Sequence, residues 1–250
     1  MDINEFFNNE TSRKHNADAL VAPAKFKDWQ TNNAVLEEYF KWIREESRCA
    51  SLKLDIAAPL EEVTAELESK AHIIAIHHRE GNSQGWKVIT LHGLSSIMTD
   101  NISYYEETGI VTGPVDYNWT DVSKFFPVTV EWIKCHVPLA KYSRARIMLL
   151  EPHGYIMPHK DYTGQMLGGG LNIAITNPNG VQFGLSDGGL VPWQPGDFRM
   201  IDIARYHSVR NNSDKVRIHM IISPPVFDWD LSAKRIVCQS YTNYKGISND

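Results

Sequence analysis

The sequence contains only three cysteines, and their positions suit neither cross-linking nor zinc binding. Cys49, Cys135 and Cys238 lie far apart in the 250-residue chain, and no pair has CxxC spacing. An odd number of widely spaced cysteines argues against a disulfide framework and against a structural zinc site. We therefore expect a reduced, cytoplasmic protein.

Long apolar runs and clusters of basic residues are also missing. No stretch approaches the roughly 20 apolar residues that a membrane-spanning helix requires, and the N-terminus has no signal-peptide pattern. The 25 Lys and Arg residues are outnumbered by 30 Asp and Glu residues, and no basic run occurs. The chain therefore lacks the electrostatic signature of nucleic-acid binding. We expect a small-molecule or peptide partner, no nucleic acid and no membrane, and the sequence leaves the oligomeric state open.

The first part of the chain predicts helices and a few strands. Helices are expected to begin at Asn32 or Asn33, at Pro59 and at Pro127, the last ending at His136. In the second helix four glutamates are expected to face water: Glu61, Glu62, Glu66 and Glu68. Strands are expected over His72–His77 and Trp86–Leu91, and a long aromatic loop over residues 95–120.

The pattern changes at Arg144, where short β-rich runs begin to alternate with Gly, Pro, Asn and Asp turns. Six such runs follow: Ala145–Leu150, Gly170–Thr176, Val181–Leu185, Phe198–Ile203, Tyr206–Val209 and Val216–Ser223. Many short strands at close spacing are typical of a sandwich or barrel. We expect a mainly β fold with flanking helices, followed after Pro224 by mixed polar sequence.

Three residues in this region form a candidate metal site. His159 and Asp161 are two residues apart, and on a strand this spacing places both side chains on the same face. His207 lies on a later predicted strand and can supply a second imidazole. Two histidines and one carboxylate with open coordination positions suit a non-haem Fe(II) oxygenase. We therefore predict His159, Asp161 and His207 as the catalytic metal ligands.

Arg217 stands inside an apolar strand ten residues after His207. A buried guanidinium needs an anionic partner, because an unpaired one costs several kcal/mol. Its fork of N–H donors matches a carboxylate bidentately. A dicarboxylate that chelates iron through its keto-acid end and meets Arg217 with its far carboxylate explains both features.

The stretch 144–223 resembles the aspartyl/asparaginyl β-hydroxylase family of Fe(II)- and 2-oxoglutarate-dependent oxygenases. The matching segments are Arg144–Leu150, Pro158–Asp161, Ile175–Pro178 and His207–Asn211 leading to Arg217. The resemblance implies a double-stranded β-helix (a cupin-like jelly roll), with Fe(II), 2-oxoglutarate and O2 as cofactor and cosubstrates. It implies hydroxylation of an unactivated C–H with decarboxylation of 2-oxoglutarate to succinate. We expect residues 1–50 to form a helical extension and 51–250 the jelly-roll domain, with its core at 144–223.

Departures from the family pattern concern the substrate and the cosubstrate pocket. This chain keeps Asp161, which vertebrate protein-modifying members lack, and so looks more like bacterial small-molecule members. Asn172 stands where those vertebrate members use a cosubstrate-binding histidine, and Met148 replaces their serine contact. The resemblance implies an amino acid or a peptidyl Asp-, Asn- or Pro-like residue as substrate, because members acting on free proline share the motifs.

Weaker candidates for substrate binding are Arg146, Gln165 and Trp193. A surface charge remains the simpler interpretation of Arg146, and core or rim packing that of Trp193. Two other functions stay open from the sequence. One is a jelly-roll module that binds a metal or another ligand without redox chemistry, and the other is a cupin-type dioxygenase that needs no 2-oxoglutarate.

Overall fold

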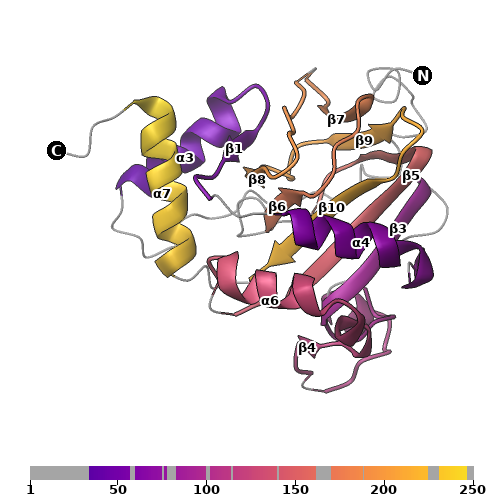
Figure 1. Cartoon of the computed structure of the whole chain (residues 1–250). Coiled ribbons are helices and arrows are strands. Elements are labelled where there is room, and N and C mark those ends of the chain that lie inside the picture. The colour runs from indigo at the N-terminus through magenta and orange to yellow at the C-terminus, as the bar shows by residue number, and fades with distance from the viewer. Residues whose placement is uncertain are drawn as a thin grey trace.

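The computed structural model describes residues 34–56, 60–74, 76–77, 83–99, 102–113, 115–139, 141–161, 170–187, 189–224 and 231–246 (Figure 1). Antiparallel strands form the centre of the molecule, and helices α4 and α6 lie across them. The predictions for residues 1–33 and for Gln165 fall outside the described residues. Within those residues, no helix is long and apolar enough to cross a membrane.

The ten strands are connected by hydrogen bonds into one sheet that folds over at β5, and its larger part, called here the major sheet, contains strands from both halves of the chain. Its antiparallel order is β1 (Ser51–Lys53), β8 (Phe198–Ile201), β6 (Leu171–Ala174), β10 (Arg217–Ser223), β5 (Arg144–His159), β3 (Ser83–Gly93) and β2 (Ile76–His77). The short strand β4 (Asn118–Trp119) pairs with β3. Residues as far apart as Ser51 and Ile201 are thus direct neighbours.

The second half of β5 leaves β10 and begins a smaller sheet, called here the minor sheet. There β5 pairs with β9 (His207–Asn211), which pairs with β7 (Val181–Leu185). The strand bends where His153 adopts a positive φ of 59°. A side chain at the following Gly154 would place its Cβ 2.7 Å from the Gln84 carbonyl oxygen, so this close strand crossing requires glycine.

Successive strands after residue 143 alternate between the two sheets. The first half of β5, then β6, β8 and β10 belong to the major sheet, and the second half of β5, β7 and β9 to the minor sheet. This alternation is a double-stranded β-helix, and it confirms the predicted mainly β fold with flanking helices. Alternating side chains give the major sheet two different faces.

The two faces of the major sheet contribute to two different hydrophobic core clusters. The outer face, with residues such as Ile147, Ile173 and Met220, packs against the helices in the larger cluster. The inner face faces the minor sheet, with Met148 and Ala174 packing against Phe183 and Val209. Several buried polar side chains also lie on strands of the inner face, among them Arg146, Asn172, Arg199, Arg217 and His219. This polar inner face is the floor of the candidate site.

Seven helical elements complete the described fold: α3 (Ala34–Lys41), the π-helix η2 (Trp42–Glu46), α4 (Glu61–Ile74), α5 (Ile102–Glu107), the 3-10 helix η3 (Asp121–Phe125), α6 (Pro127–His136) and α7 (Leu231–Lys245). All three predicted helices are present, and α6 has the predicted ends. Helix α7 was not predicted, because its sequence is mixed and polar. It packs beside α3 through aromatic contacts, with the rings of Tyr241 and Tyr39 5.7 Å apart.

Three sequence predictions in the first half of the chain need correction. The strand expected over His72–His77 is reduced to β2 (Ile76–His77), because α4 continues to Ile74, adding one hydrogen bond per residue once the helix has started. The loop expected over residues 95–120 contains α5 and β4. Glu66 does not face water: it is only 8% exposed and accepts hydrogen bonds from the Thr129 backbone N–H (2.8 Å) and hydroxyl (2.7 Å). It satisfies free N–H groups at the start of α6.

Candidate metal and cosubstrate site

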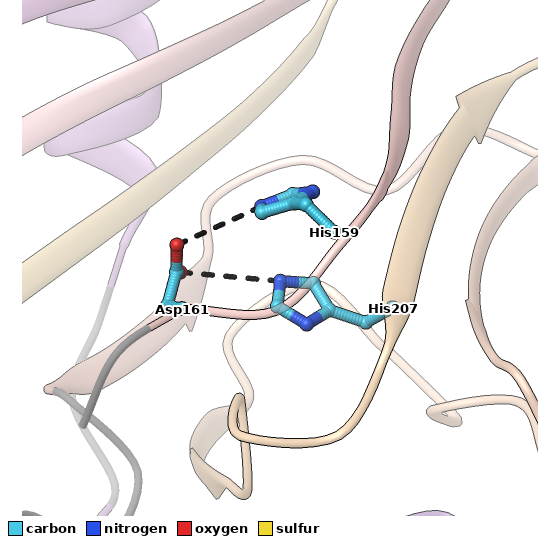
Figure 2. Close-up of side chains that lie close together, drawn as sticks. All are labelled: His159, Asp161 and His207. Carbon is cyan, nitrogen blue, oxygen red and sulfur yellow. Dashed lines mark ion pairs between the residues drawn. The ribbon is translucent and has the colours of Figure 1, made fainter. Parts of the chain in front are cut away.

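The structure brings the three predicted metal ligands together at one end of the β-helix. His159 ends β5, Asp161 follows two residues later, and His207 begins β9 directly opposite His159 in the ladder. Figure 2 shows the three side chains pointing toward one another. Nε2 of His159 is 3.8 Å from Asp161 Oδ1, and Nε2 of His207 is 4.0 Å from Asp161 Oδ2. All three candidate ligand atoms lie within 4.8 Å of one another.

Backbone carbonyls fix the orientation of both imidazoles. The Nδ1 atoms lie 2.7 Å from the Met157 carbonyl oxygen for His159 and 2.9 Å from the Arg205 carbonyl oxygen for His207. A carbonyl only accepts, so each neutral ring must carry its proton on Nδ1. Each Nε2 then presents its lone pair toward the cluster. This is the arrangement by which proteins orient metal-binding histidines.

The surroundings of His207 keep it neutral. Burial, and secondly the nearby His159, lower its pKa to about 4, although Asp161 acts in the opposite direction. The Phe183 ring stacks on the His207 ring at 5.4 Å with an interplanar angle of 10°. Asp161, whose side chain is 41% exposed, lies on the open side of the cluster. Two neutral imidazoles and one carboxylate with an open side fit a ferrous ion that must still accept further ligands.

Arg217 lies on the inner face of the major sheet, at the start of β10. It is only 3% exposed, and its Nη2 donates a 3.0 Å hydrogen bond to His219 Nδ1. Its buried Nε has no acceptor, and no carboxylate of the described residues forms an ion pair with it. Burial lowers the pKa of Arg217 to about 10, so the guanidinium is still charged at neutral pH. A buried cation with an unused donor is the feature expected of an anion-binding residue.

His219 is a site residue that the sequence analysis missed. Its Nδ1 accepts from Arg217, so its proton is on Nε2, which donates to Asn172 Oδ1 at 3.3 Å. The Asn172 amide in turn donates to the Gly170 carbonyl oxygen at 3.1 Å. Burial and then the Arg217 charge lower the pKa of His219 well below its usual range, so the ring is neutral. The available signal was the Arg-x-His spacing, which places two side chains on one strand face just as His-x-Asp does.

The remaining predicted residues surround this inner face. Trp193 is buried, as core packing predicts, and its ring meets His219 edge-on at 4.8 Å. Arg146 is 8% exposed, which corrects its interpretation as a surface charge, and its Nη1 donates to the Thr99 carbonyl oxygen at 3.1 Å. The strand register separates Arg217 from Arg146 by four positions along the β5–β10 ladder, since Arg217 pairs with Leu150 and Arg146 with Ile221.

The fold and the clustered ligand atoms define a double-stranded β-helix of the kind that holds a 2-His-1-carboxylate metal centre. The chain belongs to the aspartyl/asparaginyl β-hydroxylase family, because the model of that family matches residues 53–224, more than half of the chain. Membership makes the protein a hydroxylase that uses Fe(II), 2-oxoglutarate and dioxygen. The predicted family and cofactors are thereby confirmed.

Several solved structures are similar to this one at low sequence identity. A 2-oxoglutarate-Fe(II) oxygenase family oxidoreductase from Burkholderia pseudomallei is 11% identical, with a TM-score of 0.42 over 81% of this chain and 95% of that chain. A prolyl-4-hydroxylase from Pseudomonas putida is 10% identical, with a TM-score of 0.41 over 76% of this chain and 99% of that chain. No curated protein sequence matches the chain. The family assignment therefore rests on the match over residues 53–224, and the fold on the sheet order.

Proposed function

We propose that His159, Asp161 and His207 bind Fe(II) and that Arg217 binds the distal carboxylate of 2-oxoglutarate. The observation that carries this proposal is the combination of a three-ligand cluster on strands of the minor sheet with a buried guanidinium on the inner face of the major sheet that has no carboxylate partner among the described residues. When bound, the iron supplies the oxidising chemistry that inserts one oxygen atom of O2 into a substrate C–H while 2-oxoglutarate becomes succinate and CO2. The protein's own residues bind, orient and exclude water.

The geometry gives each residue a separate task. His159 and His207 are held by backbone carbonyls with Nε2 free, so both can bind a metal without turning. Arg217 offers its unused Nε and the remainder of its fork to a carboxylate. His219 holds one side of that fork and is itself held by Asn172, so we propose that Asn172 supports the cosubstrate through His219. The keto acid would then extend from Arg217 toward the triad.

The substrate proposed for this site is an amino acid or a peptidyl residue with an anionic group. Arg146 supports this proposal, because it is a buried cation on the inner face of the major sheet, four positions from Arg217 along the β5–β10 ladder. Gln165 remains a second candidate contact from the sequence. For the chain as a whole, we propose a helical extension over residues 1–50 and an oxygenase domain over 51–250.

Replacing His219 by alanine should weaken 2-oxoglutarate binding while leaving the metal in place. The variant loses the hydrogen bond that orients the Arg217 fork, and one such bond contributes about 0.5–1.5 kcal/mol, or roughly 2- to 12-fold in affinity. We expect a several-fold rise in the KM for 2-oxoglutarate with unchanged Fe(II) affinity, measured by succinate release and by metal titration. A His219→Ala variant that bound less iron but kept its cosubstrate KM would contradict this role.

Anaerobic titration tests the function as a whole. Protein loaded with Fe(II) should develop a weak visible charge-transfer band when 2-oxoglutarate is added, and neither component alone should produce it. The band should be missing in His159→Ala. Tight metal binding without the band would favour the non-redox binding module or the dioxygenase that needs no 2-oxoglutarate. The buried Arg217 argues against both alternatives, because neither requires a buried anchor for a carboxylate.

A further inference from the structure

The turn between β8 and β9, residues 202–206, supplies a backbone carbonyl to two of the three triad residues. The Ile203 carbonyl oxygen accepts the Asp161 backbone N–H at 2.9 Å. The Arg205 carbonyl oxygen lies 2.9 Å from His207 Nδ1 and accepts a hydrogen bond from its N–H. The position of this turn therefore decides where both the carboxylate and the second imidazole lie.

The side chain of Arg205 extends from this turn to the end of the N-terminal helical segment. Its Nη1 donates to the Ser47 carbonyl oxygen at 3.1 Å, and its Nη2 donates to the Ile43 carbonyl oxygen at 3.1 Å and also to that of Arg44. These carbonyls lie at the C-terminal end of the π-helix η2, which directly follows α3. The last carbonyls of a helix have no partners within it and carry its negative dipole end, so a guanidinium is a suitable cap.

Further contacts hold Arg205 and the turn in place. Nη1 also pairs with Asp187 Oδ2 at 3.0 Å, and Nε lies 3.8 Å from Asp202 Oδ2. Asp202 itself donates its backbone N–H to the Ala50 carbonyl oxygen at 2.8 Å. The turn that holds two triad residues is thus tied to the segment 43–50 by side-chain and backbone bonds.

We propose that Arg205 is a positioning residue that makes the helical segment 34–50 part of the metal site. This segment precedes residue 53, where the family match begins, so the contact adds to the family core. Its helices pack in the same core cluster as the major sheet through Tyr39, Trp42 and Ile43, so the helix end is a rigid anchor. The proposal rests on the proposed metal-binding role of the triad.

Replacing Arg205 should weaken metal binding without disturbing Arg217, the proposed binding residue for 2-oxoglutarate. Loss of partners that orient metal ligands typically costs 10- to 100-fold in metal affinity. Arg205→Ala keeps the backbone carbonyl that orients His207 and removes only the side-chain contacts that hold the turn, so we expect it to raise the dissociation constant for Co(II), used as a spectroscopic probe for Fe(II), by up to about 10-fold. The visible Co(II) bands should also shift, because the imidazole and the carboxylate change their geometry. Arg205→Lys, which keeps the charge but lacks the fork, should show a smaller effect of the same kind.

Tyr241→Phe provides the matched control. It removes the 3.0 Å hydrogen bond from the Tyr241 hydroxyl to Glu38 and so perturbs α3 without touching the turn. This variant should bind Co(II) with wild-type affinity and spectrum even if its melting temperature falls. If Tyr241→Phe weakened Co(II) binding as much as Arg205→Ala does, the effect would be general destabilisation and the proposal would be wrong.

The possible results distinguish a failure of the Arg205 proposal from a failure of the proposed metal site. Wild-type protein that binds neither Co(II) nor Fe(II) refutes the metal site itself. Wild-type protein that binds Co(II), together with Arg205→Ala of unchanged affinity and spectrum, refutes only the coupling through Arg205. If Arg205→Ala does not fold, Arg205→Lys decides, and wild-type Co(II) binding by that variant overturns the proposal.

Discussion

Asp161→Ala should reduce succinate formation by more than about 100-fold, because loss of partners behind metal ligands already costs 10- to 100-fold and Asp161 is proposed as a ligand itself. The structure supports this expectation, since Asp161 is the only carboxylate in the described cluster and lies within 4.0 Å of Nε2 of both histidines. Without it, two neutral imidazoles would face a dication with no compensating charge.

Metal-dependent thermal stability provides a second measurement for this variant. A ligand that binds only the folded state stabilises it by an amount that grows with the logarithm of its concentration divided by its dissociation constant, and so raises the melting temperature. Fe(II) or Co(II) should therefore raise the melting temperature of the wild type and much less that of Asp161→Ala. Asp214→Ala is a suitable control, because that carboxylate side chain is 95% exposed and lies outside the cluster. Equal metal stabilisation of Asp161→Ala and the wild type would remove Asp161 from the site.

Arg217→Met should abolish 2-oxoglutarate binding at ordinary concentrations and yet leave the cosubstrate-free protein at least as stable as the wild type. Truncating one partner of a buried charge pair costs about 2–5 kcal/mol of binding, or roughly 30- to 5,000-fold in affinity. Arg217 has no carboxylate partner among the described residues, and its Nε has no acceptor. Replacing a buried charge by an apolar side chain of similar length is often neutral or stabilising.

The two readouts of this variant distinguish a cosubstrate anchor from a structural arginine. An anchor predicts a large rise in the KM for 2-oxoglutarate, together with an unchanged or higher free energy of unfolding in the absence of ligand. A structural arginine predicts the reverse: a protein that unfolds more easily and a nearly normal KM. Urea unfolding and succinate release measure the two quantities. Co(II) binding serves as the control, because Arg217 is not in the metal cluster and metal affinity should persist.

Helices α6 and α7 show which parts of the fold local sequence patterns can predict. Helix α6 begins at Pro127 and ends at His136 as predicted, because proline is preorganised for a helix start and the signal lies within a few residues. Helix α7 was missed because its residues are mixed and polar, and its place beside α3 is decided by aromatic contacts to Tyr39, near the other end of the chain. Glu66 was misplaced for the same reason, since its partner Thr129 lies 63 residues away.

The sequence by itself determined the chemical identity of the site. His159 and Asp161 share a strand face because side chains alternate with period two, and a lone arginine in an apolar strand indicates a missing anion. Only the tertiary structure decided that His207 pairs with His159, that His219 and Asn172 stand behind Arg217, and that Arg205 caps the helix ending near Ser47. Periodicity records only which way a side chain points from its own element. Contacts between distant elements, especially those to backbone carbonyls that every residue carries, arise only when the sheets close and the helices pack on them.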